Sequence, residues 1–176
     1  MFNMVIKGTV KVKKLYDEIE LPQYKTQGSA CFDLSACLLE EKIDVYDAIN
    51  KKTFERVFTD GNDRFLHIYP RNRVMVPTGL IFDLPSGFSM RIHPRSGTSY
   101  KQGLCLVNSE GVVDNDFVLE TKILLTNTSR ERVTICHGER IAQAEIVPMY
   151  VANFIETTDE IAKKTDRVDG FGSTGK

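Results

Sequence analysis

Apolar and polar positions along the chain follow the period of short β-strands and show no long helical repeat. Residues 10–13 alternate apolar and charged side chains, which is typical of a half-buried strand. Short apolar runs then recur between turn residues such as glycine and proline, at positions 31–38, 66–69, 74–76, 80–84, 88–92, 104–107, 122–125, 132–135 and 141–147. Short strands separated in this way predict an all-β barrel or sandwich.

Asp33 is an acidic residue within the apolar run 31–38. The alternation of the run slightly favours a position that faces solvent. A buried position beside a cationic partner is the alternative, because an unpaired buried charge would be very costly. Both positions stay open on the sequence.

Residues 40–66 have no single pattern. The spacing of Ile43, Tyr46 and Ile49 suits a short helix, whereas residues 53–58 and the turn residues after them suit an arm of a hairpin. A segment of this length usually has its own structure or a function. We therefore treat it as an insertion in the domain and as a possible contact for an unknown protein partner.

The chain has 176 residues, the size of one domain. We expect one β domain over residues 1–156 and a polar tail over 157–176, which cannot bury enough apolar area to order by itself. Lysine plus arginine number 23 against 24 acidic residues, which argues against nucleic acid as a partner of a broad basic face. The chain lacks an apolar segment of signal-peptide or membrane-spanning length, so we expect no membrane contact and a soluble cytoplasmic protein.

The four cysteines form no Cys-x-x-Cys pair, and three of them stand among apolar neighbours. This pattern predicts buried, reduced thiols rather than a disulfide framework. The three histidines are equally scattered along the chain. The sequence therefore indicates no zinc site.

Residues 93–117 contain groups suited to phosphate chemistry. Arg95 supplies a planar cationic fork, Ser96 a hydroxyl group, and Gly97 a backbone that a ligand can approach closely. Backbone N–H groups in such a turn form a concavity for anions. Many surface turns contain the same residue types, so this turn alone does not establish a site. We expect a hairpin after it, built on the apolar run 104–107.

Three polar residues stand beside β-forming segments, namely Asn108, Asp114 and Gln143. Gly111 permits a tight turn, and the β-branched pair 112–113 predicts a stiff strand that ends at Asp114. A carboxylate in that position can orient and deprotonate a water molecule, although an ordinary polar turn is the alternative. Gln143 lies among apolar residues and needs either a backbone group or a ligand oxygen as its partner.

These segments together resemble the trimeric dUTPase family (deoxyuridine triphosphatases). All five motifs of that family occur in order over nearly the whole chain. They are GSACFDLSA (28–36), PRSGTSYKQG (94–103), NSEGVVDNDF (108–117), GERIAQ (138–143) and RVDGFGSTG (167–175).

The resemblance implies a jelly-roll-like (β-clip) subunit, a homotrimer, and hydrolysis of dUTP to dUMP and pyrophosphate. Mg²⁺ would be carried on the substrate phosphates rather than in a protein metal site. Asp114 would activate the attacking water, and Asp33 would support the site. The nucleoside would be bound by Asn108, Val112, Val113 and Phe117. The phosphates and the closure of a flexible C-terminal lid would depend on Arg95, Ser96, Gly97, Gln143, Arg167 and Phe171.

The chain departs from the family pattern at four places. Cys31 stands where the first motif commonly has glycine, and residues 118–120 replace an Arg-Gly-Glu-like run. Arg167 and Phe171 are one residue closer together than is usual, and residues 40–66 are an insertion relative to compact members. The replacement at 118–120 concerns trimer contacts, and the shorter fifth motif concerns closure of the lid.

Two other functions are compatible with the same scaffold. dCTP deaminases share the third motif but carry a catalytic glutamate ten residues after its aspartate, where this chain has Leu124. An aliphatic side chain cannot move protons at the pyrimidine ring, so deamination is disfavoured. A nucleotide-controlled binding or signalling protein is the other alternative, and the insertion and the altered tail are the features that favour it.

Overall fold

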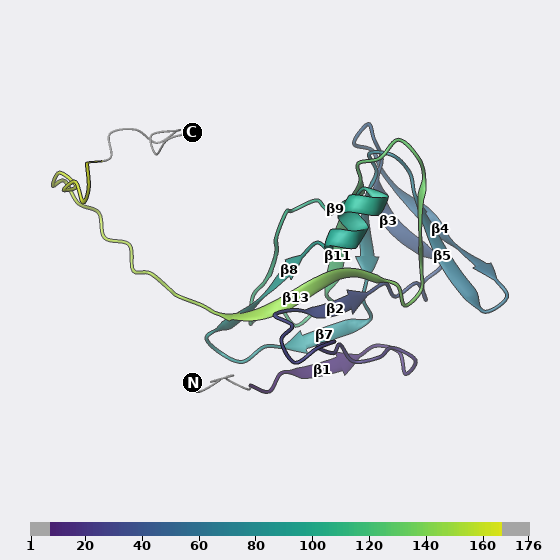
Figure 1. Cartoon of the computed structure of the whole chain (residues 1–176), viewed down its shortest axis with the longest axis horizontal. Helices are drawn as coiled ribbons and strands as arrows, with labels where there is room; N and C mark the ends of the chain where they lie inside the picture. Colours follow the sequence, from purple (N-terminus) through teal and green to yellow (C-terminus); the bar gives the residue numbers. More distant parts are fainter. Residues whose placement is uncertain (1–7, 167–176) are drawn as a thin grey trace.

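Short β-strands and one helical turn account for the regular structure of residues 8–166, the part of the chain that the computed structural model describes (Figure 1). The elements are β1 (Lys11–Lys14), β2 (Phe32–Ser35), β3 (Lys42–Tyr46), β4 (Lys52–Asp60), β5 (Asp63–Ile68), β6 (Arg73–Pro77), β7 (Leu80–Asp83), β8 (Phe88–His93), the turn η1 (Thr98–Gln102), β9 (Leu104–Leu106), β10 (Gly111–Val113), β11 (Lys122–Asn127), β12 (Val133–Cys136) and β13 (Arg140–Pro148). The predicted all-β fold is confirmed. No helix among the described residues is both long and apolar enough to cross a membrane.

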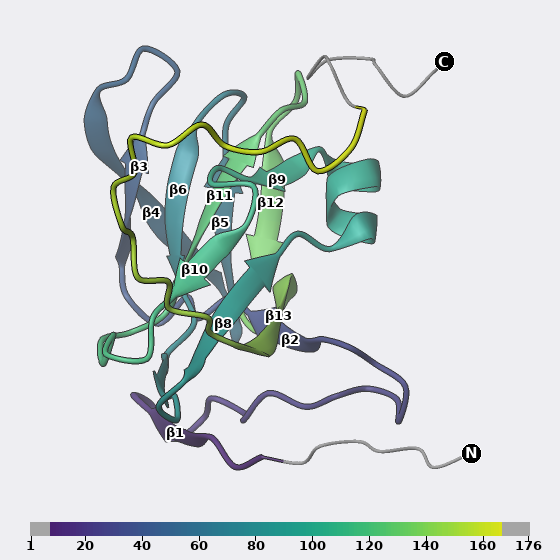
Figure 2. The same cartoon turned by 90° about the vertical axis from the view of Figure 1, so that its left-hand side faces the viewer.

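The strands form three antiparallel sheets. A four-stranded sheet has the order β10-β8-β13-β2, and a seven-stranded sheet has the order β12-β5-β4-β3-β6-β11-β9. The third sheet is the pair β1-β7. Figure 2 shows β8 and β10 lying across the strands of the seven-stranded sheet. Among the described residues, strand β10 has only β8 beside it, so one of its edges is open in this part of the chain.

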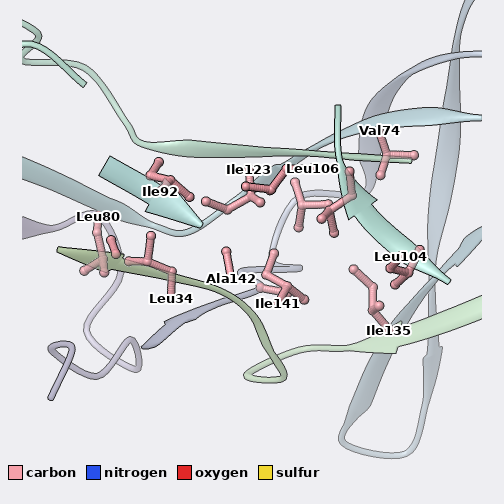
Figure 3. Close-up of a cluster of buried hydrophobic side chains, with 14 of the residues drawn as sticks. Leu34, Val74, Leu80, Ile92, Leu104, Leu106, Ile123, Ile135, Ile141 and Ala142 are labelled. Carbon is pink, nitrogen blue, oxygen red and sulfur yellow. The ribbon is translucent and has the colours of Figure 1, made fainter. Parts of the chain in front are cut away.

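The core lies between the two larger sheets, because the alternate side chains of each strand point to opposite faces. Leu34, Ile92 and Ala142 come from the four-stranded sheet, and Val74 and Ile123 come from the seven-stranded sheet (Figure 3). All five are at most 5% exposed. This packing fixes the position of β8 and β13, which lead into the candidate site.

Residues 40–66 form strands, so the helical alternative is wrong and the hairpin alternative holds. Strand β4 pairs with β3 on one side and with β5 on the other. Gly61, with a φ of 59°, lies in the turn between the paired residues Asp60 and Asp63, and positive φ is easily adopted by glycine. The inserted strands β3 and β4 lie between β5 and β6, inside the order of the seven-stranded sheet.

The prediction of buried thiols is right for Cys37 and wrong for the other cysteines. Cys37 is 1% exposed, whereas Cys31 and Cys105 are half-buried and Cys136 is exposed. Apolar neighbours in sequence do not imply burial in a strand, since adjacent side chains point to opposite faces. All four thiols are free, and burial raises the pKa of Cys37.

The chain leaves the β domain after β13. Residues 150–166 have no strand and are exposed along their whole length, and Figure 1 shows this segment extending away from the sheets. Several large apolar side chains lie on it, including Tyr150, Phe154 and Ile155, which are 92%, 93% and 82% exposed. The domain boundary at residue 156 stays a prediction.

Candidate functional site

Residues 107–110 form a crossover loop between the two larger sheets rather than the predicted hairpin. Strand β9, before the loop, pairs with β11, whereas β10, after it, pairs with β8. The hairpin prediction is therefore wrong, because pairing depends on partners that are distant in sequence.

The crossover loop and β10 form one wall of a pocket of about 520 Å³. Four of the residues predicted to bind a nucleoside line it, namely Asn108, Val112, Val113 and Phe117. The remaining lining residues are mostly apolar and come from β10 itself, from the segment before β11, and from strands β6, β8 and β11: Met75, Ile92, Gly111, Leu119, Glu120, Thr121, Lys122 and Leu124. We call this cavity the nucleoside pocket. Asp114 follows directly after β10 and is exposed.

Gly111 allows the crossover loop to pack closely on β8. A Cβ atom at this position would lie 3.1 Å from the Cβ atom of Ile92 and 3.4 Å from Nδ2 of Asn108. Ordinary van der Waals contacts are longer than the first of these distances. The absence of a side chain at Gly111 thus sets the position of the Asn108 amide.

The segment that contains Arg95, Ser96 and Gly97 follows β8, and we call residues 94–97 the phosphate turn. Arg95 donates from Nε to Oδ1 of Asp33 at 3.0 Å and from a terminal nitrogen to the backbone oxygen of Arg140 at 2.9 Å. Its guanidinium group is thereby held by two strands. Ser96 and Gly97 are exposed beside it.

Asp33 lies on the face of β2 opposite the core residues Phe32 and Leu34, as the alternation predicts, and it also has cationic partners on that face. Its Oδ2 atom accepts a hydrogen bond from Arg140 at 3.0 Å while Oδ1 accepts from Arg95, and its side chain is 15% exposed. The two arginines partly cover this outer face of β2, which limits the exposure of Asp33 to solvent. Asp33 therefore holds the guanidinium group of Arg95 in one orientation.

Gln143 lies at the same side of the molecule as the phosphate turn. Its Nε2 atom donates to the backbone oxygen of Pro94 at 2.9 Å, and the residue is half-buried. We expected either a backbone group or a ligand oxygen as the partner of this amide, and the structure shows the backbone group. A second pocket, of about 400 Å³, lies nearby and is lined by Arg95, Gly97, Thr98, Lys101, Gln102, Gly138, Glu139 and Arg140.

One chain does not bring all predicted site residues into one cavity. The nucleoside pocket and the pocket at the phosphate turn share no lining residue. Asn108, Val112, Val113 and Phe117 belong to the first, and Arg95 and Gly97 belong to the second. Arg167 and Phe171 lie outside the described residues. The structure thus presents two separate half-sites.

Comparison with known proteins identifies the family of this chain. The family model described as dUTPase matches residues 63–175. A protein named deoxyuridine 5'-triphosphate nucleotidohydrolase from Rhizobium etli is 40% identical over 158 residues, covering 89% of this chain and 86% of its own length. The chain belongs to the dUTPase family.

Solved dUTPase structures share the fold of this chain. The dUTPase of Staphylococcus bacteriophage 80alpha, in a structure with dUpNHpp, aligns with a TM-score of 0.70 at 18% identity and covers 96% of this chain and 99% of its own. The dUTPase of phage phi11 of S. aureus aligns with a TM-score of 0.63 at 16% identity, covering 86% and 98%, and its description includes a structural Mg(II) ion. These likenesses concern the fold.

Among residues 8–166 of this dUTPase-family chain, no group of three histidine, cysteine or carboxylate side chains could hold a metal ion. At the phosphate turn, both oxygens of Asp33 are bound by arginines, and Oε2 of Glu139 accepts from the backbone of Cys136. These carboxylates are committed to protein contacts. The described residues do not provide a cage for a divalent cation.

Sequence reasoning missed several residues of the site. Arg140 lies within the GERIAQ motif, three residues before Gln143. Its charge in that motif was the feature of the sequence that could have pointed to a role in the site. Met75 lines the nucleoside pocket from β6, where it pairs in register with Leu124 of β11, the position that the comparison with deaminases had already pointed to. Nothing in the local sequence of β6 indicates the role of Met75, because it depends on the order of strands in the sheet.

Proposed function

We propose that this chain hydrolyses dUTP to dUMP and pyrophosphate. The observation that carries the proposal is the nucleoside pocket, which gathers Asn108, Val112 and Phe117 from the motif that also contains Asp114. The relatives named as deoxyuridine triphosphate nucleotidohydrolases support the same reaction.

Uracil recognition is assigned to the crossover loop and to the open edge of β10. An edge strand presents backbone N–H and C=O groups that the sheet does not use, and uracil offers two carbonyl oxygens and an N–H group along one side. The Asn108 amide adds a side-chain donor and acceptor. The pocket walls of Val113 and Ile92 are apolar and closely packed, so a bulkier base is opposed by contact rather than by charge.

Hydrolysis is assigned to Asp114 as the general base. Its carboxylate takes a proton from a water molecule that attacks the α-phosphorus, and the bond to the bridging oxygen breaks with release of pyrophosphate. The attack brings an oxygen nucleophile toward a centre surrounded by negative oxygens, so fixed cations must offset that charge. Arg95, oriented by Asp33, is such a cation, and Ser96, Gly97 and Gln143 complete the phosphate contacts.

Two separate half-sites in one chain support a homotrimer with shared sites. In this arrangement the nucleoside pocket of one chain meets the phosphate turn of another. Mixing two inactive variants, Asp114→Asn and Arg95→Ala, tests this directly. Co-refolded mixtures should regain part of the activity, because some sites then combine an intact pocket with an intact turn. Activity no higher than the sum of the two variants would reject shared sites.

Mg²⁺ is proposed as a cofactor that enters with the substrate. When bound to the triphosphate oxygens it would neutralise charge on the leaving pyrophosphate. This binding mode agrees with carboxylates that are already committed to arginine and backbone partners at the phosphate turn. Titrating EDTA against dUTP turnover tests the requirement.

Residues 157–176 are proposed as a lid, with Arg167 over the phosphates and Phe171 on the base. The family motif at 167–175 supports this role. A chain that ends at Thr165 should keep its oligomeric state and lose most turnover, since closure excludes water and completes a site. Loss of folding in this variant would make the tail a structural element instead.

A protein partner at residues 40–66 stays a proposal of lower rank. The exposed rings of Phe54 and Phe58, at 48% and 43%, are the surface that such a partner would contact. Deaminase activity is opposed by Leu124, which is an aliphatic wall of the nucleoside pocket.

Measuring pyrophosphate release from dUTP tests the main proposal, with dCTP, dTTP and UTP as controls. Release should occur with dUTP and be far slower with the others. No release from dUTP at micromolar enzyme would reject the hydrolase, and ammonia release from dCTP would instead establish a deaminase.

A further inference from the structure

A cluster of charged side chains lies beside the nucleoside pocket. Its central residue, Glu110, is part of the third motif, but the proposed function gives it no role. Glu110, the last residue of the crossover loop, places Oε2 at 3.6 Å from Arg91 and Oε1 at 3.7 Å from Nδ1 of His93. Both partners lie on β8, the strand that runs into the phosphate turn. The carboxylate of Glu110 therefore joins the end of the crossover loop to the strand beneath it.

His93 is itself held from the other side. Its Nε2 atom lies 3.1 Å from Oε1 of Glu145 on β13, within hydrogen-bonding distance. Arg91 and Glu145 are also paired in register across β8 and β13. The side chains of Arg91 and His93 are 31% and 28% exposed, and that of Glu110 is 48% exposed, so Glu110 is held from one side by partly buried partners while solvent screens its other side.

The crossover loop is held at both of its ends. At its start, the Val107 backbone donates to the oxygen of Leu124 at 3.0 Å. At its centre, Ser109 adopts a φ of 59°, a left-handed conformation that is uncommon for residues other than glycine. Asn108, the residue before it, reaches into the nucleoside pocket. The pairing of β10 with β8 begins at Gly111, and the contacts of Glu110 add a side-chain attachment between Ser109 and that pairing.

We propose that Glu110 is a positioning residue for base selection. Held by Arg91 and His93, it fixes the crossover loop so that the Asn108 amide and the edge of β10 face the base in one orientation. It acts through Asn108 and does not touch the reacting atoms. This inference rests on the proposed dUTP hydrolysis for its substrate class, and it adds a residue that discriminates uracil from cytosine.

The test compares binding of dUDP and dCDP by calorimetry with turnover of dUTP, in the wild type and in Glu110→Ala. We expect the preference for dUDP over dCDP to fall about three- to tenfold and KM for dUTP to rise by a similar factor, since small displacements of orienting groups are costly. The value of kcat should stay within about twofold, because Asp114 lies beyond β10. An unchanged preference for dUDP would overturn the inference, whatever happens to KM.

Two further variants separate positioning from a general loss of structure. Glu110→Gln keeps the volume and one acceptor oxygen, so it should restore part of the preference; a Gln variant no better than alanine would overturn the role of the acceptor. It also provides the test if the alanine variant does not fold. Asp83→Ala is the matched control, because it removes an exposed carboxylate 3.8 Å from Lys11 on the β1–β7 pair, and it should leave the preference unchanged.

Failure of the proposed function gives a different result. A wild-type protein that releases no pyrophosphate would reject the hydrolase, while calorimetry would still decide whether Glu110 controls base preference. A wild type that shows no preference between dUDP and dCDP would overturn the inference itself.

Discussion

The nucleoside pocket and the phosphate turn are built by different means. The pocket consists of strands and a close-packed loop: Gly111 lies against Ile92, and apolar side chains from β6 and β11 form the far wall. The phosphate turn is held by charged side chains, because Asp33 binds Arg95 and Arg140 at 3.0 Å each. The pocket is held by close packing and backbone pairing, and the phosphate turn is held by ion pairs between side chains.

We therefore assign base recognition to the pocket and stabilisation of phosphate charge to the phosphate turn. Backbone groups and packed walls are rigid and uncharged, which suits discrimination between bases of similar size. Ion networks stabilise the charge that develops on phosphates during attack. Changes at the charged groups should therefore affect turnover most, and changes in the pocket should affect substrate binding.

Replacing Asp114 with asparagine should have the largest effect. The change keeps the shape of the side chain but removes the proton acceptor, so kcat should fall about 10³-fold while dUTP binding is kept. Steady-state pyrophosphate release and calorimetric binding measure the two quantities. Asp116→Asn is the matched control, since Asp116 is also exposed and lies two residues further on. Unchanged turnover in Asp114→Asn would reject Asp114 as the base.

Replacing Asp33 with alanine should give the next largest effect. Arg95 and Arg140 would lose a common partner in a half-buried position, at a cost of about 2 kcal/mol in the free energy of unfolding. With Arg95 no longer oriented, kcat/KM should fall about thirtyfold. Urea denaturation and steady-state kinetics check both values.

The control for Asp33→Ala is Asp83→Ala, which removes an exposed carboxylate near Lys11. An exposed pair of this kind contributes at most about 1 kcal/mol. Equal destabilisation in both variants would show that the network at the phosphate turn has no special structural role, and the proposed contrast between the two regions would fail.

Replacing Gly111 with alanine should have a smaller effect, confined to the nucleoside pocket. The new Cβ atom would lie 3.1 Å from the Cβ atom of Ile92, so the crossover loop must move by a few tenths of an ångström. We expect KM for dUTP to rise about fivefold with kcat nearly unchanged, and a cost of about 1 kcal/mol in stability. Gly28→Ala is the control, because nothing lies within 4 Å of a Cβ atom there. A fall in kcat alone would contradict the assignment of this region to binding.

The sequence predicted local features of this molecule better than long-range ones. Apolar periodicity located most strands, and four residues that the motifs predicted, Asn108, Val112, Val113 and Phe117, line one pocket. The partners of Asp33 could not be predicted, because Arg95 and Arg140 lie 62 and 107 residues away. The crossover between sheets after β9 was missed for the same reason, since the sheet that takes up a strand is decided by global packing. The two half-sites likewise depend on contacts between distant strands.

The smallest effect concerns a histidine away from both regions. The ring of His67 packs against the rings of Phe58 and Phe65, with centroid separations of 5.0 and 5.3 Å. Its Nδ1 atom lies 2.9 Å from the hydroxyl oxygen of Thr134. Burial lowers the pKa of His67 below its ordinary value of 6.5, and Arg132 adds to the shift. Folding therefore favours the neutral ring, so the unfolded chain binds the proton more readily as pH falls below 6.5. The stability that this residue contributes is present above that pH and is lost as pH falls through the lower, folded-state pKa.

A His67→Gln variant should accordingly lose less stability than the wild type between pH 7.5 and pH 5.5, as measured by urea denaturation. The pH profile of dUTP turnover should be the same in both proteins, because His67 lines neither the nucleoside pocket nor the pocket at the phosphate turn. Equal loss of stability in the two proteins would contradict the preference for the neutral ring. A changed turnover profile would instead show that β5 is coupled to one of the two half-sites, and the scaffold and the site could then no longer be treated as independent.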